Sequence, residues 1–485
     1  MKSKCKSEKK TNDKRTSRRS CPRVSSDLPK LNLNAAGIDV GSHSHYVAVP
    51  PGRDYGGCVR EFKCYTSDLY AMGSWLKACG IESVAMESTG VYWIPVFQVL
   101  ESLGFEVTLV NPKYVKNVAG RKTDVSDCQW IQQLHTYGLL SASFRPDDEI
   151  CVLRCYWRHR DMLVKYASSH IQHMQKALDL MNIHIHKAIS DITGVTGMSI
   201  VRAILSGERN PVVLAQMRDP RIKCTEDELV EALQGDYRPE HLFTLGQALN
   251  LYDFYFQQIA ECDRQIEGCL TQMGTKWEAP QEPSQANNAN ADHNSIAGKP
   301  KKKRVGGNAP TFDLHTHLIT LCGGLDVTQI DGMNVVTGLT AISETGLDMS
   351  KWLSEKHFCS WLALSPNNRI SGGRVLSAST RKVTSRAAYT FRMAAQSLHR
   401  SPTALGAFYR RIKGRLGAKA AITATAHKIA RLYYNMLKYG KDYVDQGQDY
   451  YNKRYHDRVI KGLQRKAAAM GYQLVPDVQG AYGVT

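Results

Sequence analysis

The pattern of apolar and polar residues changes twice along this chain. Between residues 35 and 146, short apolar or alternating runs of strand length alternate with helix-length segments. Residues 147–277 and 313–440 carry mostly helical spacing with few breakers. The pattern predicts an α/β domain, then a long helical arm, then a mainly α domain.

Two of the strands expected in the first region involve acids. The strands are expected at 36–42, 46–49, 58–65, 81–86 and 105–110, with helices at 67–79 and 91–103. Asp39 lies inside the first strand, where a charge is unfavourable unless it is paired or bound to a cation. Glu87 follows the strand at 81–86, and strand ends are where α/β sheets present ligand-binding groups. Both are candidate metal ligands, whereas His43 and His45 are expected to be solvated or packed.

A second pair of acids, Asp124 and Asp127, stands at the start of an apparent helix. Residues three apart share a helix face, where two carboxylates repel unless a cation lies between them. Alternatively, Thr123 caps the helix and the acids stabilise its positive end. Taken with Asp39 and Glu87, the pair would complete a four-carboxylate site for two Mg²⁺, the arrangement used in phosphoryl transfer.

The central region predicts long helices at 147–188 and 241–273. They can pair as an antiparallel arm within one chain or dimerise, and their irregular heptads do not decide between these. Residues 278–312 are expected to form a disordered linker with a basic cluster at 299–304. That cluster matches a nuclear-import signal superficially, and contact with phosphate or simple solvation is the alternative.

In the C-terminal region, Ser371 precedes two glycines and stands between Arg369 and Arg374. Glycines let the backbone approach a ligand, and guanidinium groups bind phosphate in a bidentate manner. Ser371 is therefore a candidate nucleophile, with an ordinary turn as the alternative. The turn at 330–334 predicts either backbone contacts to DNA phosphate or a plain connection between helices.

Charge and composition narrow the class of partner. The chain has 485 residues, and 63 Lys and Arg against 45 Asp and Glu leave a net charge of +18, which favours nucleic acid as the partner. No apolar run approaches the roughly 20 residues that span a bilayer, and the 13 cysteines form no CxxC pair, so a soluble intracellular protein with reduced thiols is expected. The predicted regions are a basic disordered tail (1–34), an α/β domain (35–146), a helical arm (147–277), the linker (278–312), a serine-containing domain (313–440) and a C-terminal helix with a tail (441–485).

Three motifs carry a resemblance. Gly-Ile-Asp-Val-Gly at 37–41, Met-Glu-Ser-Thr-Gly at 86–90 and Lys-Thr-Asp-x-x-Asp at 122–127 resemble the DEDD transposases of the insertion-sequence one-hundred-and-ten family. The resemblance covers roughly 35–145 and 314–440. It implies a RuvC-like, RNase-H-type N-terminal fold in which four acids bind Mg²⁺ and a C-terminal domain with a catalytic serine. The matching residues are Asp39, Glu87, Asp124, Asp127 and Ser371.

The chain departs from the family pattern at two positions. Asp331 stands where the family usually has Pro, and Ala363 where it usually has Gly, so the local backbone can differ there. Ten basic residues are expected to contact nucleic acid or, alternatively, to form a solvated face. They are Arg369, Arg374, Arg381, Lys382, Arg386, Arg410, Arg411, Lys413, Arg415 and Lys419.

The resemblance implies a Mg²⁺-dependent recombinase of a mobile element that exchanges DNA strands through a phosphoserine intermediate. It further implies an element-encoded bridge RNA that pairs with target and donor DNA. It also implies a homodimer or homotetramer that assembles through coiled-coil segments and has composite sites, and a bacterial, nucleoid-associated location. Two alternatives stay open. One is a junction nuclease that uses water as the nucleophile, and the other is a nonenzymatic RNA-binding scaffold.

Overall fold

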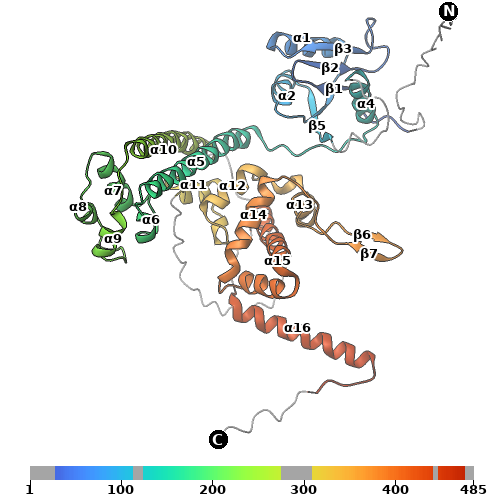
Figure 1. Ribbon diagram of the computed structural model, residues 1–485. Helices are drawn as coiled ribbons and strands as arrows, with labels where there is room; N and C mark the ends of the chain where they lie inside the picture. Colours follow the sequence, from blue (N-terminus) through green and yellow to red (C-terminus); the bar gives the residue numbers. More distant parts are fainter. Residues whose placement is uncertain (1–27, 113–123, 275–307, 441–445, 476–485) are drawn as a thin grey trace, which may run out of the picture. The chain divides into compact units, whose positions relative to one another are not determined.

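The computed structural model describes residues 28–112, 124–274, 308–440 and 446–475. The chain divides into two compact units, Met1–Arg145 and Pro146–Thr485, whose elements are labelled in Figure 1. Three predicted features lie outside the described residues: the tail up to residue 27, the helix cap at Thr123 and the basic cluster at 299–304.

The first unit is built on a five-stranded sheet with the order β3-β2-β1-β4-β5. β1, β2 and β3 are antiparallel neighbours, and β4 and β5 extend the sheet parallel to β1. The strands are β1 (Ala35–Val40), β2 (Ser44–Ala48), β3 (Val59–Lys63), β4 (Ser83–Glu87) and β5 (Glu106–Val110). Each predicted strand segment thus contains or overlaps one observed strand.

Helices cover both faces of this sheet. They are α1 (Thr66–Ala78), α2 (Trp93–Ser102) and α4 (Asp124–Thr136). Ile38 and Met86 belong to the hydrophobic core that the sheet forms with α1 and α2. Ala85 instead packs with Ile131 of α4. Because side chains alternate along a strand, the neighbours of Ile38 and Met86 in the sequence point toward the α4 face.

The second unit begins with a two-helix arm, α5 (Asp148–Leu180) and α10 (Pro239–Gly274). The two helices run antiparallel, since Arg160 pairs with Asp263 while Tyr166 and His170 lie against Tyr255. Four short helices form the arm tip between them, α6 (Ile185–Ala188), α7 (Val195–Leu205), α8 (Pro211–Ala215) and α9 (Glu226–Leu233). The prediction of one helix through residue 188 was wrong, because Asn182 adopts a left-handed conformation (φ 59°) two residues after α5 ends.

The remaining described elements of this unit are mainly helical. The helices are α11 (Leu314–Leu321), η1 (Val327–Gln329), α12 (Val335–Thr345), η2 (Met349–Lys351), α13 (Glu355–Trp361), α14 (Arg386–Ser397), η3 (Leu398–Arg400), α15 (Ala404–Tyr439) and α16 (Gly447–Ala469). Phe358, Phe391 and Tyr433 form its buried aromatic centre. The backbone is non-helical at Gly417 (φ 82°), so α15 consists of two helical segments that meet at a kink.

One hairpin interrupts this helical unit, formed by β6 (Arg369–Ser371) and β7 (Arg374–Ser377). It extends away from the neighbouring helices α13 and α14 (Figure 1). The predicted fold class, an α/β domain followed by a long helical arm and a mainly α domain, is therefore confirmed. Within the described ranges, every helix is too short or too polar to cross a membrane.

Candidate functional site

Asp39 and Glu87 lie side by side near the carboxyl ends of two parallel strands. The register pairs Ile38 of β1 with Met86 of β4, so the next residue on each strand is Asp39 and Glu87 respectively. Neighbours in register point to the same face of a sheet. Both acids are half-buried. The two carboxylates predicted from separate motifs are therefore brought to one position on the sheet.

Helix α4 covers the face to which these acids point. A Cβ on Gly37 would lie 2.3 Å from the backbone nitrogen of Gln132 and 2.5 Å from the carbonyl oxygen of Cys128, so α4 packs closely there because residue 37 is glycine. Asp39 is two residues further along the same face. Burial raises the pKa of the Cys128 thiol to about 12, and the nearby Asp39 carboxylate adds to that rise.

The first turn of α4 brings Asp124 to the same end of the sheet. Tyr46 of β2 is the cross-strand partner of Asp39. Hydrogen bonding to Glu61 raises the pKa of Tyr46, and the nearby Asp124 carboxylate contributes to the same rise. Asp124 is exposed and Asp127, three residues later in the same turn, is half-buried. Asp124 is thus linked electrostatically to the partner of Asp39, while Asp127 is placed by the helix alone.

Tyr46 and Glu61 are neighbours of the acids that the motifs did not single out. The register pairs Tyr46 with Asp39 on one side and with Glu61 of β3 on the other. Glu61, Tyr46, Asp39 and Glu87 therefore form one row across four strands, which we call the carboxylate row. Tyr46 could have been identified from the sequence, because alternation along the two strands that flank the turn after Gly41 places it opposite Asp39.

The histidines close to Asp39 lie apart from this row. His45 pairs with Val40, is only 2% exposed and has a lowered pKa because of its burial. It shares the face of Val40, which belongs to the core under α1 and α2. His43 is exposed and hydrogen-bonds Ser42 at 2.8 Å. The expectation that both are packed or solvated agrees with this placement.

The four acids suit Mg²⁺ by their chemistry, because carboxylate oxygens are the ligands that this hard cation prefers. Asp39 and Glu87 are adjacent on one sheet face, and Asp124 lies near Tyr46, the strand partner of Asp39. Among the described residues, no three of the four acids place ligand oxygens within 4.8 Å of one another. Binding a shared ion would therefore require the side chains to rotate, which exposed and half-buried carboxylates can do.

Ser371 lies in the other unit, at the tip of the β6–β7 hairpin. It pairs with Arg374 across a two-residue turn, in which Gly372 and Gly373 have φ of 54° and 75°. Positive φ at both central residues is the geometry that favours a tight hairpin turn, and glycine adopts it without strain. Ser371 and both flanking arginines are exposed. The predicted turn is present, and it presents the hydroxyl to solvent beside a guanidinium group.

Two family models match these two regions. The model for DEDD transposases of the IS110 group matches residues 36–183, which contain all four acids, and the model described as "Transposase IS116/IS110/IS902 family" matches residues 326–410, which contain Ser371. The chain belongs to the IS110 family of transposases. It is therefore an enzyme that acts on DNA, and the resemblance carried by the three motifs is confirmed. No curated protein matches the transposase.

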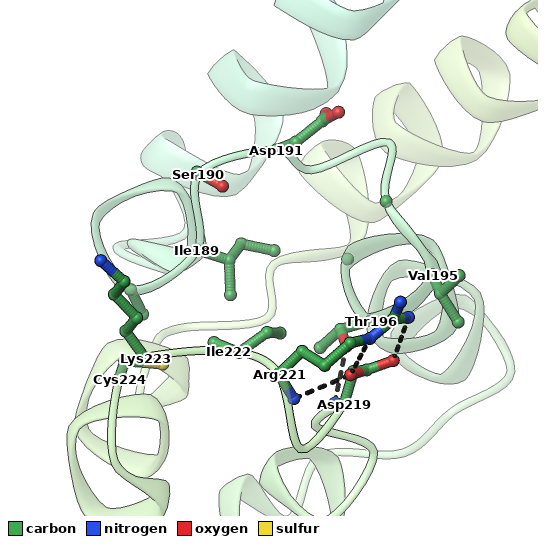
Figure 2. A pocket seen from close by; sticks show the side chains of 13 residues that line it. Ile189, Ser190, Asp191, Val195, Thr196, Asp219, Arg221, Ile222, Lys223 and Cys224 are labelled. Atoms are coloured by element: carbon green, nitrogen blue, oxygen red, sulfur yellow. Dashed lines mark hydrogen bonds and ion pairs between the residues drawn. The ribbon is translucent and has the colours of Figure 1, made fainter. Parts of the chain in front are cut away.

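The arm tip of the transposase contains a hollow of about 690 Å³ (Figure 2). Asp219 and Arg221 form a two-pronged ion pair on its wall, and this contact lowers the pKa of Asp219. Lys223 also lines the hollow. Because Arg221 is already paired with Asp219, Lys223 is the lining cation that remains available for an anionic ligand, and it is exposed.

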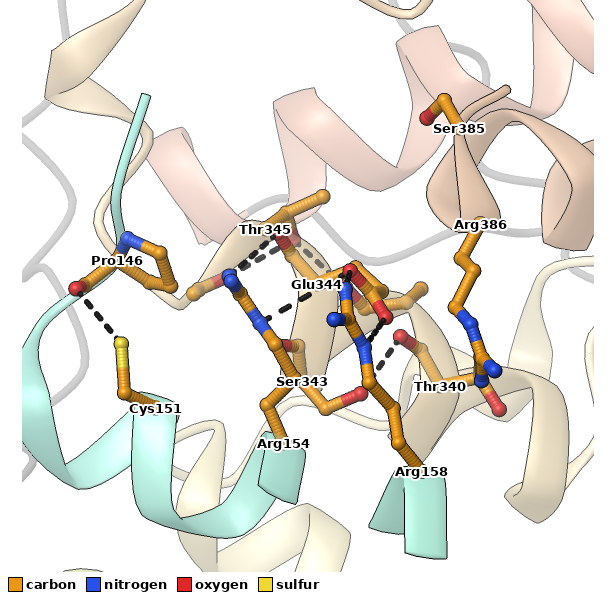
Figure 3. Close-up of polar contacts among 12 residues, drawn as sticks. Pro146, Cys151, Arg154, Arg158, Thr340, Ser343, Glu344, Thr345, Ser385 and Arg386 are labelled. Carbon is orange, nitrogen blue, oxygen red and sulfur yellow. Dashed lines mark hydrogen bonds and ion pairs between the residues drawn. The ribbon is translucent and has the colours of Figure 1, made fainter. Parts of the chain in front are cut away.

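The arm is fixed to the helices of the transposase domain at a buried carboxylate, Glu344 of α12 (Figure 3). Arg158 of α5 donates hydrogen bonds to both carboxylate oxygens at 2.8 and 2.7 Å. Arg154 donates to the backbone carbonyl oxygens of Ser343 and Glu344 at 2.9 and 3.3 Å. The beginning of α5 is thereby held against the helices that support the Ser371 hairpin.

The ten basic residues predicted to contact nucleic acid fall into two groups. Four are engaged within the transposase. Arg381 donates to the Ser360 carbonyl, Arg386 pairs with Asp161 at 3.3 Å, Arg410 donates to the Ser401 carbonyl and to Gln448, and Arg411 stacks over Tyr455. The other six lie on or after the hairpin and around the break in α15, and all of them are exposed, as are Arg381 and Arg386. They are Arg369, Arg374, Lys382, Lys413, Arg415 and Lys419.

A further basic surface, which the sequence did not single out, lies between α15 and α16. Lys428, Arg431 and Arg454 line a hollow of about 330 Å³ there together with Tyr450 and Tyr451. Burial and neighbouring arginines lower the pKa of Lys428. Aromatic and cationic side chains in one hollow are typical of single-stranded nucleic-acid contacts.

The turn at 330–334 has a structural role within the transposase domain. Gly332 has a φ of 86°, and a Cβ there would lie 2.4 Å from the carbonyl oxygen of Ala394 in α14. The glycine is therefore needed for α14 to pack against the turn. This observation favours the plain connection between helices over the predicted phosphate contact.

Proposed function

We propose that this transposase cleaves and rejoins DNA strands through a covalent phosphoserine intermediate formed by Ser371. Asp39, Glu87, Asp124 and Asp127 would hold Mg²⁺, which supplies charge neutralisation at the scissile phosphate when bound. The observation that carries the proposal is the juxtaposition of Asp39 and Glu87 in register on the α4 face. Two carboxylates held side by side repel each other, and a bound cation relieves that repulsion.

The residues of the chain divide the chemistry between them. The Ser371 hydroxyl is exposed beside Arg374, whose guanidinium can bind a phosphate oxygen and orient the phosphorus toward Oγ. Asp39 and Glu87 would keep their place through both steps because the sheet fixes their backbone. Tyr46 would keep its proton at neutral pH, since its pKa is raised, and can donate a hydrogen bond.

Strand exchange would consist of two balanced transesterifications. In the first, Ser371 Oγ bonds to phosphorus, the bond to one deoxyribose oxygen breaks, and the serine proton ends on that leaving oxygen. In the second, a hydroxyl of the incoming strand attacks the phosphoserine, and Ser371 regains its proton. The phosphodiester count is unchanged, so no ATP is needed.

DNA is the substrate, and we propose that an element-encoded RNA selects the target and donor sequences by base pairing. The net charge of +18 and the basic, Tyr-lined hollow between α15 and α16 support a nucleic-acid partner of this kind. We propose further that the transposase acts as a homodimer or homotetramer. Sequencing the RNA that copurifies with the protein tests the guide, and the absence of any defined RNA would count against it.

The serine is tested with Ser371→Ala, using Ser377→Ala on the same hairpin as the matched control. Ser377 hydrogen-bonds Ser379 at 3.0 Å and has no part in the proposed chemistry. With Mg²⁺, guide RNA and a nicked substrate that traps the intermediate, we expect a denaturation-resistant protein–DNA adduct from the parent and the Ser377 variant only. Strand exchange should fall by about 10⁴-fold or more in Ser371→Ala.

The same experiment separates the alternatives. If Ser371→Ala still cleaves DNA with Mg²⁺ and no adduct forms in any variant, the protein acts as a nuclease with a water nucleophile. If Asp124→Asn leaves cleavage and strand exchange unchanged, the proposed metal role of this acid is wrong.

A further inference from the structure

Three potential metal ligands meet at the tip of the arm, in the unit that does not carry the four acids. Asp179 lies in the last turn of α5, His184 precedes α6, and His186 lies within α6. Asn182, with its left-handed backbone, reverses the chain between them. Among the described residues, this is the one group of three His, Cys, Asp or Glu side chains whose ligand atoms all lie within 4.8 Å of one another.

The two distances from the Asp179 carboxylate to the histidines match those between ligand atoms around a tetrahedral metal ion. Nδ1 of His184 lies 3.5 Å from Oδ1 of Asp179, and Nδ1 of His186 lies 3.3 Å from the same oxygen. A tetrahedral Zn²⁺ with bonds near 2.05 Å separates its ligand atoms by about 3.4 Å. Neither contact meets hydrogen-bond geometry, and the buried His184 Nδ1 has no hydrogen-bond partner among the described residues.

The second nitrogen of His184 explains why its Nδ1 is available as a ligand. Nε2 lies 3.0 Å from Oδ1 of Asn182, which can only accept a hydrogen bond. In the neutral imidazole this contact places the proton on Nε2, and Nδ1 then presents its lone pair to the Asp179 carboxylate. Two acceptors that face each other repel unless a cation lies between them. A histidine oriented through its other nitrogen is characteristic of metal sites in proteins.

We propose that Asp179, His184 and His186 form a binding site for a divalent transition metal of the Zn²⁺ class. Two imidazole nitrogens and one carboxylate oxygen suit Zn²⁺ better than Mg²⁺ or Ca²⁺, which prefer oxygen ligands. The side chains are 47%, 34% and 34% exposed, so water can complete the coordination on the open side. This site is independent of the carboxylate row and of the proposed reaction.

A metal at this site would tie together segments that the chain itself joins loosely. It would link the last turn of α5 to α6 across the reversal at Asn182. The backbone of His184 donates to the carbonyl of Ala232 in α9, and Asp236 donates to that of Met181, so the clamp would reach the chain segment that leads into α10. The expected consequence is a more stable arm tip.

The test titrates the untagged full-length protein with cobalt(II), whose visible absorption reports tetrahedral nitrogen and oxygen ligands. Excess Mg²⁺ is present throughout to occupy the acids of the first unit. We expect one site that Asp179→Asn and His186→Ala each weaken by about 100-fold or more, and that Asn182→Ala weakens by about 10- to 100-fold. Zn²⁺ should displace the cobalt and raise the melting temperature of the parent protein but not that of Asp179→Asn or His186→Ala.

The matched control is His173→Ala. His173 is an exposed histidine on α5, and its ring lies 5.5 Å from that of His170. Neither histidine belongs to the group of three metal ligands at the arm tip. This variant should bind cobalt like the parent. Equal affinity and equal spectra for the parent, Asp179→Asn and His186→Ala would overturn the proposal, and circular dichroism confirms that each variant is folded. Asp179→Asn preserves the side-chain shape, so loss of binding in that variant reports the ligand rather than the fold.

Discussion

The carboxylate row and the Ser371 hairpin differ in how the protein holds them. Asp39 and Glu87 lie on central, paired strands whose neighbours Ile38 and Met86 are fully buried. Ser371 lies on an isolated two-stranded hairpin, where Ile370 and Val375 are 62% and 58% exposed. A hairpin of two strands is marginally stable by itself. The acids are therefore preorganised by the fold, whereas the serine is presented on an element that packing fixes only weakly.

Under the proposed function, this difference indicates that the Ser371 hairpin, rather than the acids, adapts when DNA binds. A metal-binding group gains from rigid ligands, because misplaced charges bind an ion poorly. A nucleophile that reacts with successive DNA strands must be accessible to each of them. The exposed apolar residues of the hairpin, Ile370 and Val375, offer a surface that bound DNA can bury. The predictions below examine this contrast.

Among substitutions outside the hairpin, the largest effect is expected from Glu87→Gln. Loss of one ligand should reduce Mg²⁺-dependent cleavage by about 10³-fold, equivalent to about 4 kcal/mol of transition-state stabilisation. The variant should also lose the rise in melting temperature that Mg²⁺ gives the parent, because one acid of the pair no longer carries charge. Glu82→Gln is the control, since Glu82 is exposed at the opposite end of β4. Equal cleavage by Glu87→Gln and the parent would contradict the metal role.

Asp263→Ala should destabilise the arm by about 3–5 kcal/mol, because it leaves the Arg160 charge buried and unpaired. The two side chains are only 5% and 2% exposed, and Arg160 also donates to the Asn308 carbonyl. Glu261→Ala removes an exposed pair with Arg264 (53% and 68% exposed) and should cost less than about 1 kcal/mol. Urea unfolding measures both. Similar losses in the two variants would show that the buried pair does not anchor this unit.

Two glycine substitutions compare the sheet with the hairpin directly. Gly37→Ala places a Cβ against the backbone of α4 and should cost about 1–3 kcal/mol or more, with loss of cleavage, since α4 carries Asp124 and Asp127. Gly373→Ala meets nothing within 4 Å, and its φ of 75° strains only the hairpin turn, by about 1–2 kcal/mol. We expect unchanged global unfolding but slower strand exchange for Gly373→Ala. Unfolding curves and exchange rates measured together distinguish the two effects.

The sequence was most informative where local chemistry determines the structure. Alternation and strand ends predicted the strands that hold Asp39 and Glu87, and the glycines after Ser371 predicted its turn. Two outcomes depended on long-range packing. The register that aligns Tyr46 and Glu61 with Asp39 forms between strands, and the ion pairs that occupy Arg386 and Arg158 involve partners more than 180 residues away in the sequence. The end of α5 was missed because a left-handed Asn182 resembles an ordinary helical asparagine in the sequence.

The smallest effect is expected from Tyr46→Phe, which removes a hydroxyl from the carboxylate row without changing its carboxylates. Hydrogen bonding to Glu61 is the main reason that the pKa of Tyr46 is raised in the folded protein. A raised tyrosine pKa favours the neutral form, so its contribution to stability is complete below the unfolded pKa of about 10 and is lost as the pH rises through the folded value.

Tyr46→Phe should therefore make the fall in stability above about pH 10 less steep. At lower pH, the variant should lose only the stability that the hydrogen bond to Glu61 contributes. Cleavage at neutral pH should fall by less than about tenfold, because the residue orients neighbours of the acids without binding the metal. Thermal unfolding from pH 7 to 11 measures the first effect. A drop in cleavage as large as that of Glu87→Gln would mean that the hydroxyl takes part in the reaction, and the carboxylate row would then act as a unit of four side chains.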